Sequence, residues 1–284
     1  MNYVELHTHT IFSDGEKTPE ELIRLAKKAK LRAIAITDHD SIDALPKAIK
    51  AGKNHGIEVI SGIEITAGAK KGRKTKAVHV LGLFINYKDR DFKKFVQKVK
   101  KLRMEYVKKT VKNLQNLGVR ITFDEVRKRA KNVIASPHIV EVALKNNPGI
   151  VKEPQEFYDK YMEKVKEKRS TLVTMKAAIS AIKKAGGIAI LAHPAYYNAS
   201  IVRSFKKAGG VGLEAFYPYE KYGRISKLPK KEIEKIKKKY EKLAEKYDLV
   251  KCGSSDFHGK RMRVKLGYAK LTWNVVEELK STIK

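Results

Sequence analysis

The sequence predicts a mixed α/β fold in which short strands alternate with helices, and one long helical segment interrupts the alternation. Runs of β-branched and small apolar residues recur along the chain, and helical periodicity follows them. Hydrophobic residues make up 42% of the 284 residues, enough for a core of barrel size. Because strands that alternate with helices are typical of parallel βαβ units, we expect parallel strands.

Seven strands are expected in chain order, at residues 3–7, 33–37, 58–61, 77–83, 188–192, 211–215 and 249–252. The helix expected at residues 19–30 has the clearest start. Thr18 is a suitable N-cap, Pro19 occupies the first helical position, and Glu21 stands at the capping-box spacing.

The alternation stops between residues 89 and 176. Amphipathic helices are expected there, including 92–117 and 123–131, with Pro137, Pro148 and Pro154 as breaks. We therefore expect residues 1–88 and 177–284 to form a metal-binding barrel, and residues 89–176 to form a helical insertion that faces the substrate.

The charge of the chain is strongly positive. Sixty-two Lys and Arg residues against 31 Asp and Glu residues give a formal net charge of +31. Such a field attracts phosphorylated substrates or nucleic acid, but a lysine-rich proteome with solvated helix faces explains it equally well. A single cysteine, Cys252, excludes an intramolecular disulfide, and no leader-like or membrane-spanning segment is evident, so we expect a cytoplasmic protein.

Histidines and carboxylates gather where the predicted strands end. His7 and His9 point the same way at strand spacing and are able to converge on one ion. The carboxyl ends of strands in a parallel barrel form one rim, so distant residues meet there. His55 lies in a helix-to-strand connection and is left out. The candidates are His7, His9, Asp14, His39, Glu64, His79, His193, Asp256 and His258.

These residues stand in motifs that resemble the PHP (polymerase and histidinol phosphatase) family of metal-dependent phosphoesterases. The motifs are His7-Thr8-His9 through Ser13-Asp14-Gly15, Thr37-Asp38-His39-Asp40, Gly62-Ile63-Glu64, His79-Val80-Leu81-Gly82, Ala192-His193-Pro194 and Ser255-Asp256-Phe257-His258-Gly259. The resemblance covers residues 1–87 and about 177–284. It implies a distorted (β/α)7 barrel, similar to a TIM barrel, with a trinuclear metal centre that acts on phosphate mono- and diesters.

The resemblance also implies how the ligands divide. His7, His9, Glu64 and Asp256 would hold one metal. Glu64, His79 and His193 would hold a second, with Glu64 bridging, and Asp14, His39 and His258 would hold a third. Mixed imidazole and carboxylate ligands suit Mn, Zn or Fe, with Mg also allowed. No catalytic protein group is then required beyond a metal-activated water.

Three further carboxylates are expected to support the ligands. Asp38 and Asp40 flank His39 and are candidates to orient imidazoles, although Asp40 is equally suited to cap the following helix. Glu214 ends another predicted strand and is a candidate to contact the ligands or the substrate.

Within the family, the chain most resembles nucleoside 3′,5′-bisphosphate phosphatases and 5′→3′ exoribonucleases. Ser136-Pro137-His138 is similar to an insertion motif of that group and makes His138 a candidate substrate-binding residue, with a helix-start role as the alternative. Tyr217 is a candidate for stacking on a base, with core packing favoured. Cations on expected loops, Arg73, Lys168, Arg169 and Arg261, are candidates for phosphate binding.

Two other functions fit the same residues in part. A small-molecule phosphatase of the histidinol-phosphatase type would need the same metals and a tighter pocket. A non-catalytic RNA-binding subunit would have no reason to keep nine metal-binding residues. The expected partners are thus a nucleotide or short oligonucleotide, with longer nucleic acid as a further partner and the oligomeric state left open.

Overall fold

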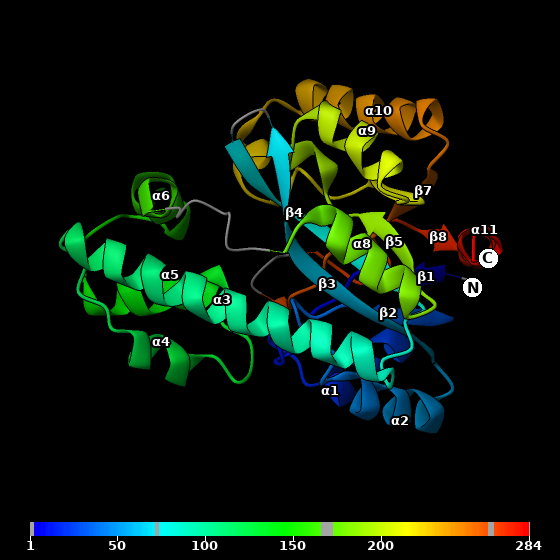
Figure 1. Ribbon diagram of the computed structural model, residues 1–284, viewed down its shortest axis with the longest axis horizontal. Coiled ribbons are helices and arrows are strands. Elements are labelled where there is room, and N and C mark those ends of the chain that lie inside the picture. Colours follow the sequence, from blue (N-terminus) through cyan, green and yellow to red (C-terminus); the bar gives the residue numbers. More distant parts are fainter. Residues whose placement is uncertain (1–2, 72–73, 166–172, 261–263, 284) are drawn as a thin grey trace.

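The computed structural model describes residues 3–71, 74–165, 173–260 and 264–283, and its centre is one eight-stranded sheet. In chain order the strands are β1 (Tyr3–Glu5), β2 (Ala33–Ile36), β3 (Glu58–Lys71), β4 (Lys74–Leu83), β5 (Ile188–Leu191), β6 (Gly212–Phe216), β7 (Val250–Gly253) and β8 (Leu271–Thr272). Their spatial order is β7-β6-β5-β4-β3-β2-β1-β8, and Figure 1 shows the sheet curling into a nearly closed barrel.

The barrel almost closes because the chain beyond β7 meets the chain beyond β1. Thr8 and Phe257 form a parallel bridge, and the His9 N–H donates to the Phe257 carbonyl at 2.9 Å. The mixed α/β barrel expected from the sequence is therefore confirmed, with β8 as an eighth strand that the sequence did not signal.

The prediction of uniformly parallel strands is wrong at β3 and β4. β3 continues to Lys71 instead of ending near Ser61, and β4 returns beside it antiparallel, with Thr66 opposite His79. β4 is also antiparallel to β5, whereas β1–β2, β2–β3, β5–β6 and β6–β7 are parallel. A hairpin replaces a βαβ unit here because β3 and β4 follow each other without an intervening helix.

The barrel helices are α1 (Pro19–Lys28), α2 (Leu45–His55), α8 (Met175–Lys184), α9 (Ala199–Lys207), α10 (Lys230–Lys246) and α11 (Trp273–Ser281), with short 3-10 turns η3 (Pro194–Tyr196) and η4 (Arg224–Lys227). The Thr18 hydroxyl accepts from Glu21 N–H and the Glu21 carboxylate accepts from Thr18 N–H, so the expected capping box is present.

The two faces of the sheet pack into different apolar clusters. Ile34 and Ile36 of β2 belong to the cluster that contains the buried faces of α1, α2, α8 and α9, whereas Ala33 and Ala35 belong to the cluster that contains α11. Both faces are therefore covered, which explains why β2 is apolar throughout.

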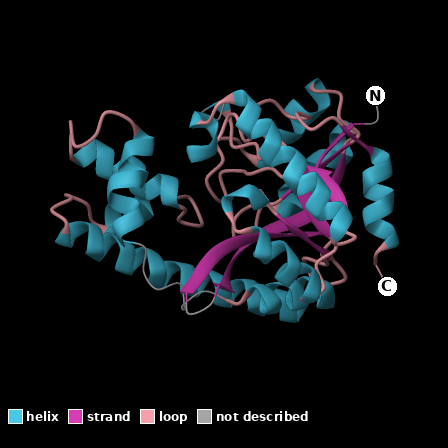
Figure 2. Ribbon diagram, turned by 90° about the horizontal axis from the view of Figure 1, so that it is seen from above, coloured by secondary structure: helices cyan, strands magenta, loops and turns pink. Residues whose placement is uncertain are grey.

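Helices fill the stretch between β4 and α8. They are α3 (Arg90–Asn116), α4 (Phe123–Arg129), α5 (Ser136–Asn146), α6 (Pro154–Phe157), the π-helical turn η1 (Tyr158–Met162) and α7 (Glu163–Val165). Figures 1 and 2 show α3 running from the barrel to a lobe at one side. Phe92 and Val96 of α3 pack in the barrel cluster, whereas Val107 and Val111 pack in a separate cluster within the lobe. One helix thus belongs to both cores.

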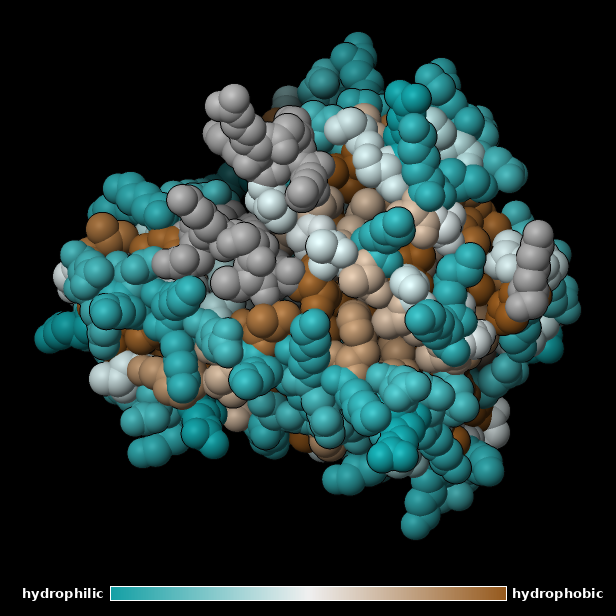
Figure 3. All heavy atoms as spheres, viewed as in Figure 1, coloured by the Kyte–Doolittle hydropathy of each residue, from teal (hydrophilic) through white to brown (hydrophobic). Residues whose placement is uncertain are grey.

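No helix within the described residues is long and apolar enough to cross a membrane. Hydrophilic side chains cover much of the face shown in Figure 3, over both the lobe and the barrel helices.

Candidate metal centre

The nine candidate ligands come from six separate parts of the barrel and meet in one place. His7, His9 and Asp14 follow β1, His39 follows β2, and His193 follows β5; Glu64 lies within β3, His79 lies within β4, and Asp256 and His258 follow β7. The side chains of these residues are buried, except that 26% of the His79 side chain is exposed. Two of these residues, His193 and Asp256, have positive φ angles of 30° and 50°, a backbone conformation that is uncommon for residues other than glycine.

The tightest group consists of His7, His9, Glu64 and Asp256. The two histidine Nε2 atoms lie 3.0 Å apart. Glu64 Oε2 lies 3.2 Å and 3.3 Å from the Nε2 atoms of His7 and His9, and Asp256 Oδ1 lies 3.3 Å and 3.1 Å from them. Four ligand atoms about 2.1 Å from a tetrahedral ion would be about 3.4 Å apart. The group therefore has nearly the dimensions of a tetrahedral metal site.

The hydrogen bonding of these atoms supports that interpretation. Glu64 Oε2 and Asp256 Oδ1 are buried and accept no hydrogen bond within the described chain, although ring nitrogens surround both. Buried carboxylate oxygens left without hydrogen bonds carry a large desolvation cost, which a divalent cation would offset. These residues fit a metal ion.

A second group surrounds the other oxygen of Glu64. His79 Nδ1 lies 2.8 Å and His193 Nε2 lies 3.1 Å from Glu64 Oε1. His39 Nδ1 lies 2.8 Å from Oε2 of the same carboxylate, and His39, Glu64 and His79 form a group able to hold an ion. The two carboxylate oxygens of Glu64 therefore face different candidate ligands, with His79 and His193 on one oxygen and His7, His9 and His39 on the other.

A third group lies around Asp14. His258 Nε2 is 3.3 Å and His9 Nδ1 is 3.7 Å from Asp14 Oδ1, and His39 Nε2 is 3.9 Å from Oδ2. All four residues offer ligand atoms within 4.8 Å of one another. Gly15 is required beside them, because a Cβ there would lie 2.3 Å from the His9 carbonyl oxygen. His39 presents one ring nitrogen to this group and the other to Glu64.

The histidines and carboxylates of the centre shift one another's pKa values. Burial opposes the charge on His9, but the carboxylates of Asp256 and Glu64 outweigh it and raise its pKa to about 10. The pKa of His7 is raised for the same reason, with Glu214 contributing. Burial alone would raise the pKa values of Glu64 and Asp256, but the facing histidines hold them well below their usual range. His79 differs, because burial lowers its pKa to about 4.

Glu214 supports the centre from β6. Its Oε1 lies 3.1 Å from His7 Nδ1, and its Oε2 accepts the His193 N–H at 2.7 Å. The side chain is 1% exposed. A carboxylate behind a ligating histidine fixes the tautomer and orientation of the ring, so Glu214 is placed to present His7 Nε2 to an ion.

Asp38 and Asp40 have different surroundings. Asp38 accepts hydrogen bonds from the Thr10 N–H and from the Ser13 hydroxyl, and Ser13 Oγ lies 3.3 Å from His9 Nδ1. Asp38 thus approaches an imidazole through Ser13. Asp40 accepts from Thr66 N–H and from Arg103 Nε. The alternative of Asp40 as a helix cap is wrong, because Ala44 occupies the N-cap of α2.

Two residues near the centre were missed by the sequence analysis. Glu5, 1% exposed, accepts the N–H groups of Ser255 and Gly267 and so fixes the loop that carries Asp256. Burial raises its pKa to about 7. Its position two residues before His7 was the available signal, since both would share a strand face. Arg103 had no such signal, because it lies in α3, far from the ligands in the sequence.

Tyr217 does not lie open for base stacking. It is 2% exposed, its ring packs against Tyr219 and Tyr222, and its hydroxyl donates to Asp256 Oδ2 at 2.8 Å. The core-packing interpretation favoured from the sequence therefore holds. The hydroxyl in addition orients the carboxylate of Asp256.

His138 and four cations on expected loops were predicted to contact the substrate. His138 is 7% exposed at the start of α5, and its Nδ1 accepts the Ala135 N–H at 3.1 Å, as a helix-start residue does. A contact between His138 and substrate stays a prediction. Arg73, Lys168, Arg169 and Arg261 lie outside the described residues.

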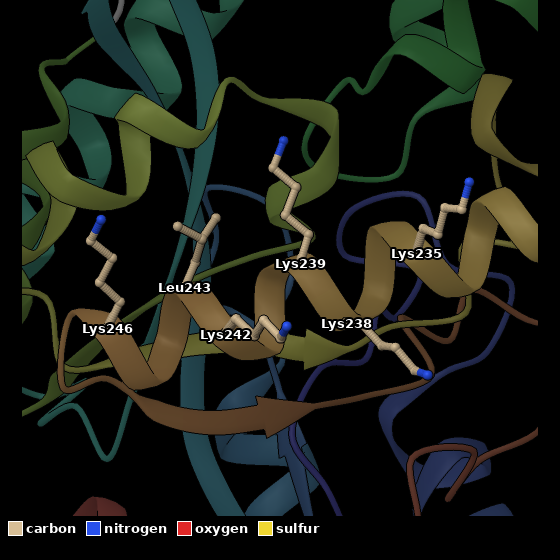
Figure 4. Close-up of a pocket in the computed structure, with 6 residues that line it drawn as sticks. All are labelled: Lys235, Lys238, Lys239, Lys242, Leu243 and Lys246. Carbon is tan, nitrogen blue, oxygen red and sulfur yellow. The ribbon is translucent and has the colours of Figure 1, made fainter.

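A row of lysines lies along α10. They line a surface groove of about 430 Å³, and Figure 4 shows them projecting from successive turns around Leu243. Within the described chain only Lys235 of the row has a carboxylate partner, Glu232 at 2.8 Å. The row consists of Lys235, Lys238, Lys239, Lys242 and Lys246.

The chain is similar in sequence and in fold to known proteins. The chain is 29% identical to a 5′-3′ exoribonuclease from Haemophilus influenzae, with 74% of this chain and 77% of the relative covered. It is 28% identical to a 3′,5′-nucleoside bisphosphate phosphatase from Chromobacterium violaceum, covering 75% and 76%. A solved structure of an amidohydrolase from Chromobacterium violaceum with bound sulfate matches with a TM-score of 0.79 and 25% identity, covering 100% and 98%. The model of the PHP domain matches residues 5–250, and the chain belongs to the PHP family.

Proposed function

We propose that this protein hydrolyses phosphate esters of nucleotides or short oligonucleotides at a centre of three divalent ions. The observation that carries the proposal is the convergence of His7, His9, Glu64 and Asp256: the facing ligand atoms lie 3.0–3.3 Å apart, and Glu64 Oε2 and Asp256 Oδ1 accept no hydrogen bond within the described chain. The substrate class is taken from the exoribonuclease and the bisphosphate phosphatase to which the chain is similar.

Family membership and clusters of His, Asp and Glu able to bind metals make the chain a metal-dependent phosphoesterase, an enzyme that hydrolyses phosphoric esters. Bound divalent ions supply such a site with Lewis acidity toward phosphoryl oxygens and with a water of lowered pKa.

Side chains of the protein would hold the ions and orient one another around them. We assign His7, His9, Glu64 and Asp256 to one ion, and Glu64, His79 and His193 to a second. Asp14, His39 and His258 are assigned to a third, with His39 also within reach of the second group. Glu214 contacts the His7 ring and the His193 backbone N–H. Its role is therefore to fix the position of His7, assigned to the first ion, relative to His193, assigned to the second. Mn, Zn or Fe suits these ligands, and Mg is allowed.

We assign the helical segment to the substrate side of the centre. The Val133 N–H donates to the Phe12 carbonyl at 3.3 Å, between His9 and Asp14 in the sequence. The loop before α5 thus lies against the loop that carries two ligands, and His138 follows it by a few residues.

The test is phosphate release by metal-stripped protein resupplied with Mn²⁺, Zn²⁺ or Mg²⁺. The substrates are adenosine 3′,5′-bisphosphate, a 5′-phosphorylated RNA oligonucleotide and histidinol phosphate. We expect turnover on the first two. His9→Ala should abolish it, whereas His55→Ala, a histidine at the end of α2, is the matched control and should retain it. Turnover on histidinol phosphate alone would refute the nucleotide assignment, and no turnover on any substrate would refute the proposal.

A further inference from the structure

Arg103 joins three parts of the structure that are distant in the sequence. From the middle of α3, its Nε donates to Asp40 Oδ2 at 2.5 Å, its Nη2 donates to Thr66 Oγ1, and its Nη1 donates to the Ile134 carbonyl at 3.3 Å. The side chain is 13% exposed and that of Asp40 only 1%. A guanidinium fixed in three directions is a rigid joint, since its planar donors cannot rotate independently.

Asp40 transmits this contact to the metal centre. Its N–H donates to the Glu64 carbonyl at 2.8 Å, and its Oδ1 accepts the Thr66 N–H at 2.8 Å. These bonds hold the chain after β2 against β3 at Glu64 and Thr66. Asp40 has a positive φ of 49°, a conformation that a non-glycine residue keeps only when its surroundings enforce it.

His39 immediately precedes Asp40 and is set by the same bonds. It forms a parallel bridge with Glu64, and its Nδ1 lies 2.8 Å from Glu64 Oε2. A shift of Asp40 away from β3 would therefore change the separation of two candidate metal ligands. Asp40 itself contacts neither imidazole nitrogen of His39 within the described structure, so the effect is on backbone position.

The rest of this contact area is more exposed. Lys100, one turn before Arg103, donates to Asp43 Oδ2 at 2.5 Å, and Asn132 donates to the same oxygen at 2.6 Å. The Asp43 side chain is 44% exposed, so this second ion pair is screened by water. Arg103, with a side chain 13% exposed, thus lies at the less exposed centre of the contact between the helical segment and the loop after β2, and Lys100, 27% exposed, belongs to its rim.

We propose that Arg103 is a positioning residue of the metal centre: by clamping Asp40 against β3, it couples the docking of the helical segment to the placement of His39 beside Glu64. The inference rests on the proposed function for the presence of metal. It differs from that function because it concerns how the centre depends on a residue that contacts none of the candidate ligands within the described structure.

The experiment measures binding of Mn²⁺ to metal-stripped protein by the EPR signal of the free ion, for the wild type, Arg103→Lys, Arg103→Met and Lys100→Met. We expect Arg103→Met to weaken at least one Mn²⁺ site by about 10-fold, the lower end of the effect of losing a supporting group. Arg103→Lys keeps a charge beside Asp40 but not all three bonds, so it should fall between. Lys100→Met should bind as the wild type does.

A second readout separates positioning from substrate contact. For adenosine 3′,5′-bisphosphate at saturating Mn²⁺, a positioning role lowers kcat and leaves KM within about 2-fold, whereas a lost phosphate contact raises KM. Thermal unfolding identifies variants that fail to fold, and Thr66→Val, which removes one acceptor of Arg103, then provides a milder change with the same expected direction.

Three results would overturn the inference. They are wild-type Mn²⁺ affinity in folded Arg103 variants, an equal loss in Lys100→Met, or a raised KM with unchanged kcat. A wild-type protein that binds no Mn²⁺ or releases no phosphate would instead refute the proposed function, so the two failures are distinguishable.

Discussion

Metal binding to this centre should release protons at a pH where ordinary histidines have none to give. At pH 8 a histidine with a pKa of 6.5 is about 3% protonated and would release almost nothing. His9, with a pKa of about 10 in the metal-free centre, is almost fully protonated at that pH. An ion that takes the Nε2 atoms of His7 and His9 must displace that proton, because only neutral imidazole is a ligand.

The number of protons released when an ion binds depends on how close His7 and His9 lie to each other. The Nε2 atoms of His7 and His9 lie 3.0 Å apart, so the two rings titrate together and the proton count belongs to the pair. The pKa of His7 is also raised, by Asp256, Glu64 and Glu214. We therefore expect between one and two protons per ion bound there. The apparent affinity should rise by at least about 10-fold per pH unit from pH 7 to 9.

Calorimetric titration of Mn²⁺ into metal-stripped protein, in two buffers with different ionisation enthalpies, measures this number. His55→Ala serves as the control and should release as many protons as the wild type. Tight binding at pH 8 without proton release would refute the reasoning, since it would mean that His7 and His9 are neutral in the metal-free protein or are not ligands.

Other predictions use the same contacts. Glu214→Gln should weaken metal binding by about 10-fold in a chelator competition, because His7 loses its charged partner. Metal-free protein should lose stability in thermal unfolding as the pH rises from about 6.5 through about 10, because a raised pKa of His9 stabilises the fold below the unfolded pKa and that contribution is lost through the folded pKa. Replacing Lys238, Lys239 and Lys242 with Gln should reduce the salt slope of RNA binding by about 2, at about 0.7 per phosphate contact.

Each of these has a distinct contrary result. Unchanged chelator competition would show that His7 keeps its orientation without Glu214. A flat stability curve in metal-free protein would contradict the raised pKa of His9. For RNA binding the matched control is Gln at Lys27, Lys28 and Lys50, which are exposed on α1 and α2. An equal fall in slope for both triple variants would assign the effect to the overall charge of the chain.

Local patterns predicted most of the barrel. Apolar runs located β1, β2, β5, β6 and β7 within one or two residues, because each strand is short, largely buried and bounded by helix-start or turn residues. The extension of β3 was missed although its pattern was visible. Ile63, Ile65 and Ala67 are buried and alternate with Glu64 and Thr66, the period of a strand. That period defines a strand but not the direction of its neighbour.

The candidate ligands and the support from Glu214 could be predicted from the sequence, whereas the contacts of Arg103 and Glu5 could not, for a physical reason. Histidines and carboxylates are rare at strand ends, so each of them can be recognised as a candidate ligand from its own position in the sequence. Supporting contacts join residues that look ordinary in sequence, such as Arg103 with Asp40, 63 residues apart, and Glu5 with Ser255, 250 residues apart. Only the folded chain shows that these residues meet.

β4 runs antiparallel to its neighbours and not parallel as predicted, yet His79 still lies at the centre. The face on which a strand residue lies depends on which residue it pairs with, and not on the direction of the strand. Glu64 pairs with Leu81 and Thr66 pairs with His79, so all four side chains share one face of the hairpin. Glu64 and His79 are diagonal neighbours there, and their side chains meet at 2.8 Å. A slip of one residue would turn His79 to the opposite face. The register of the β3–β4 hairpin is therefore as necessary to the metal centre as the identity of its ligands.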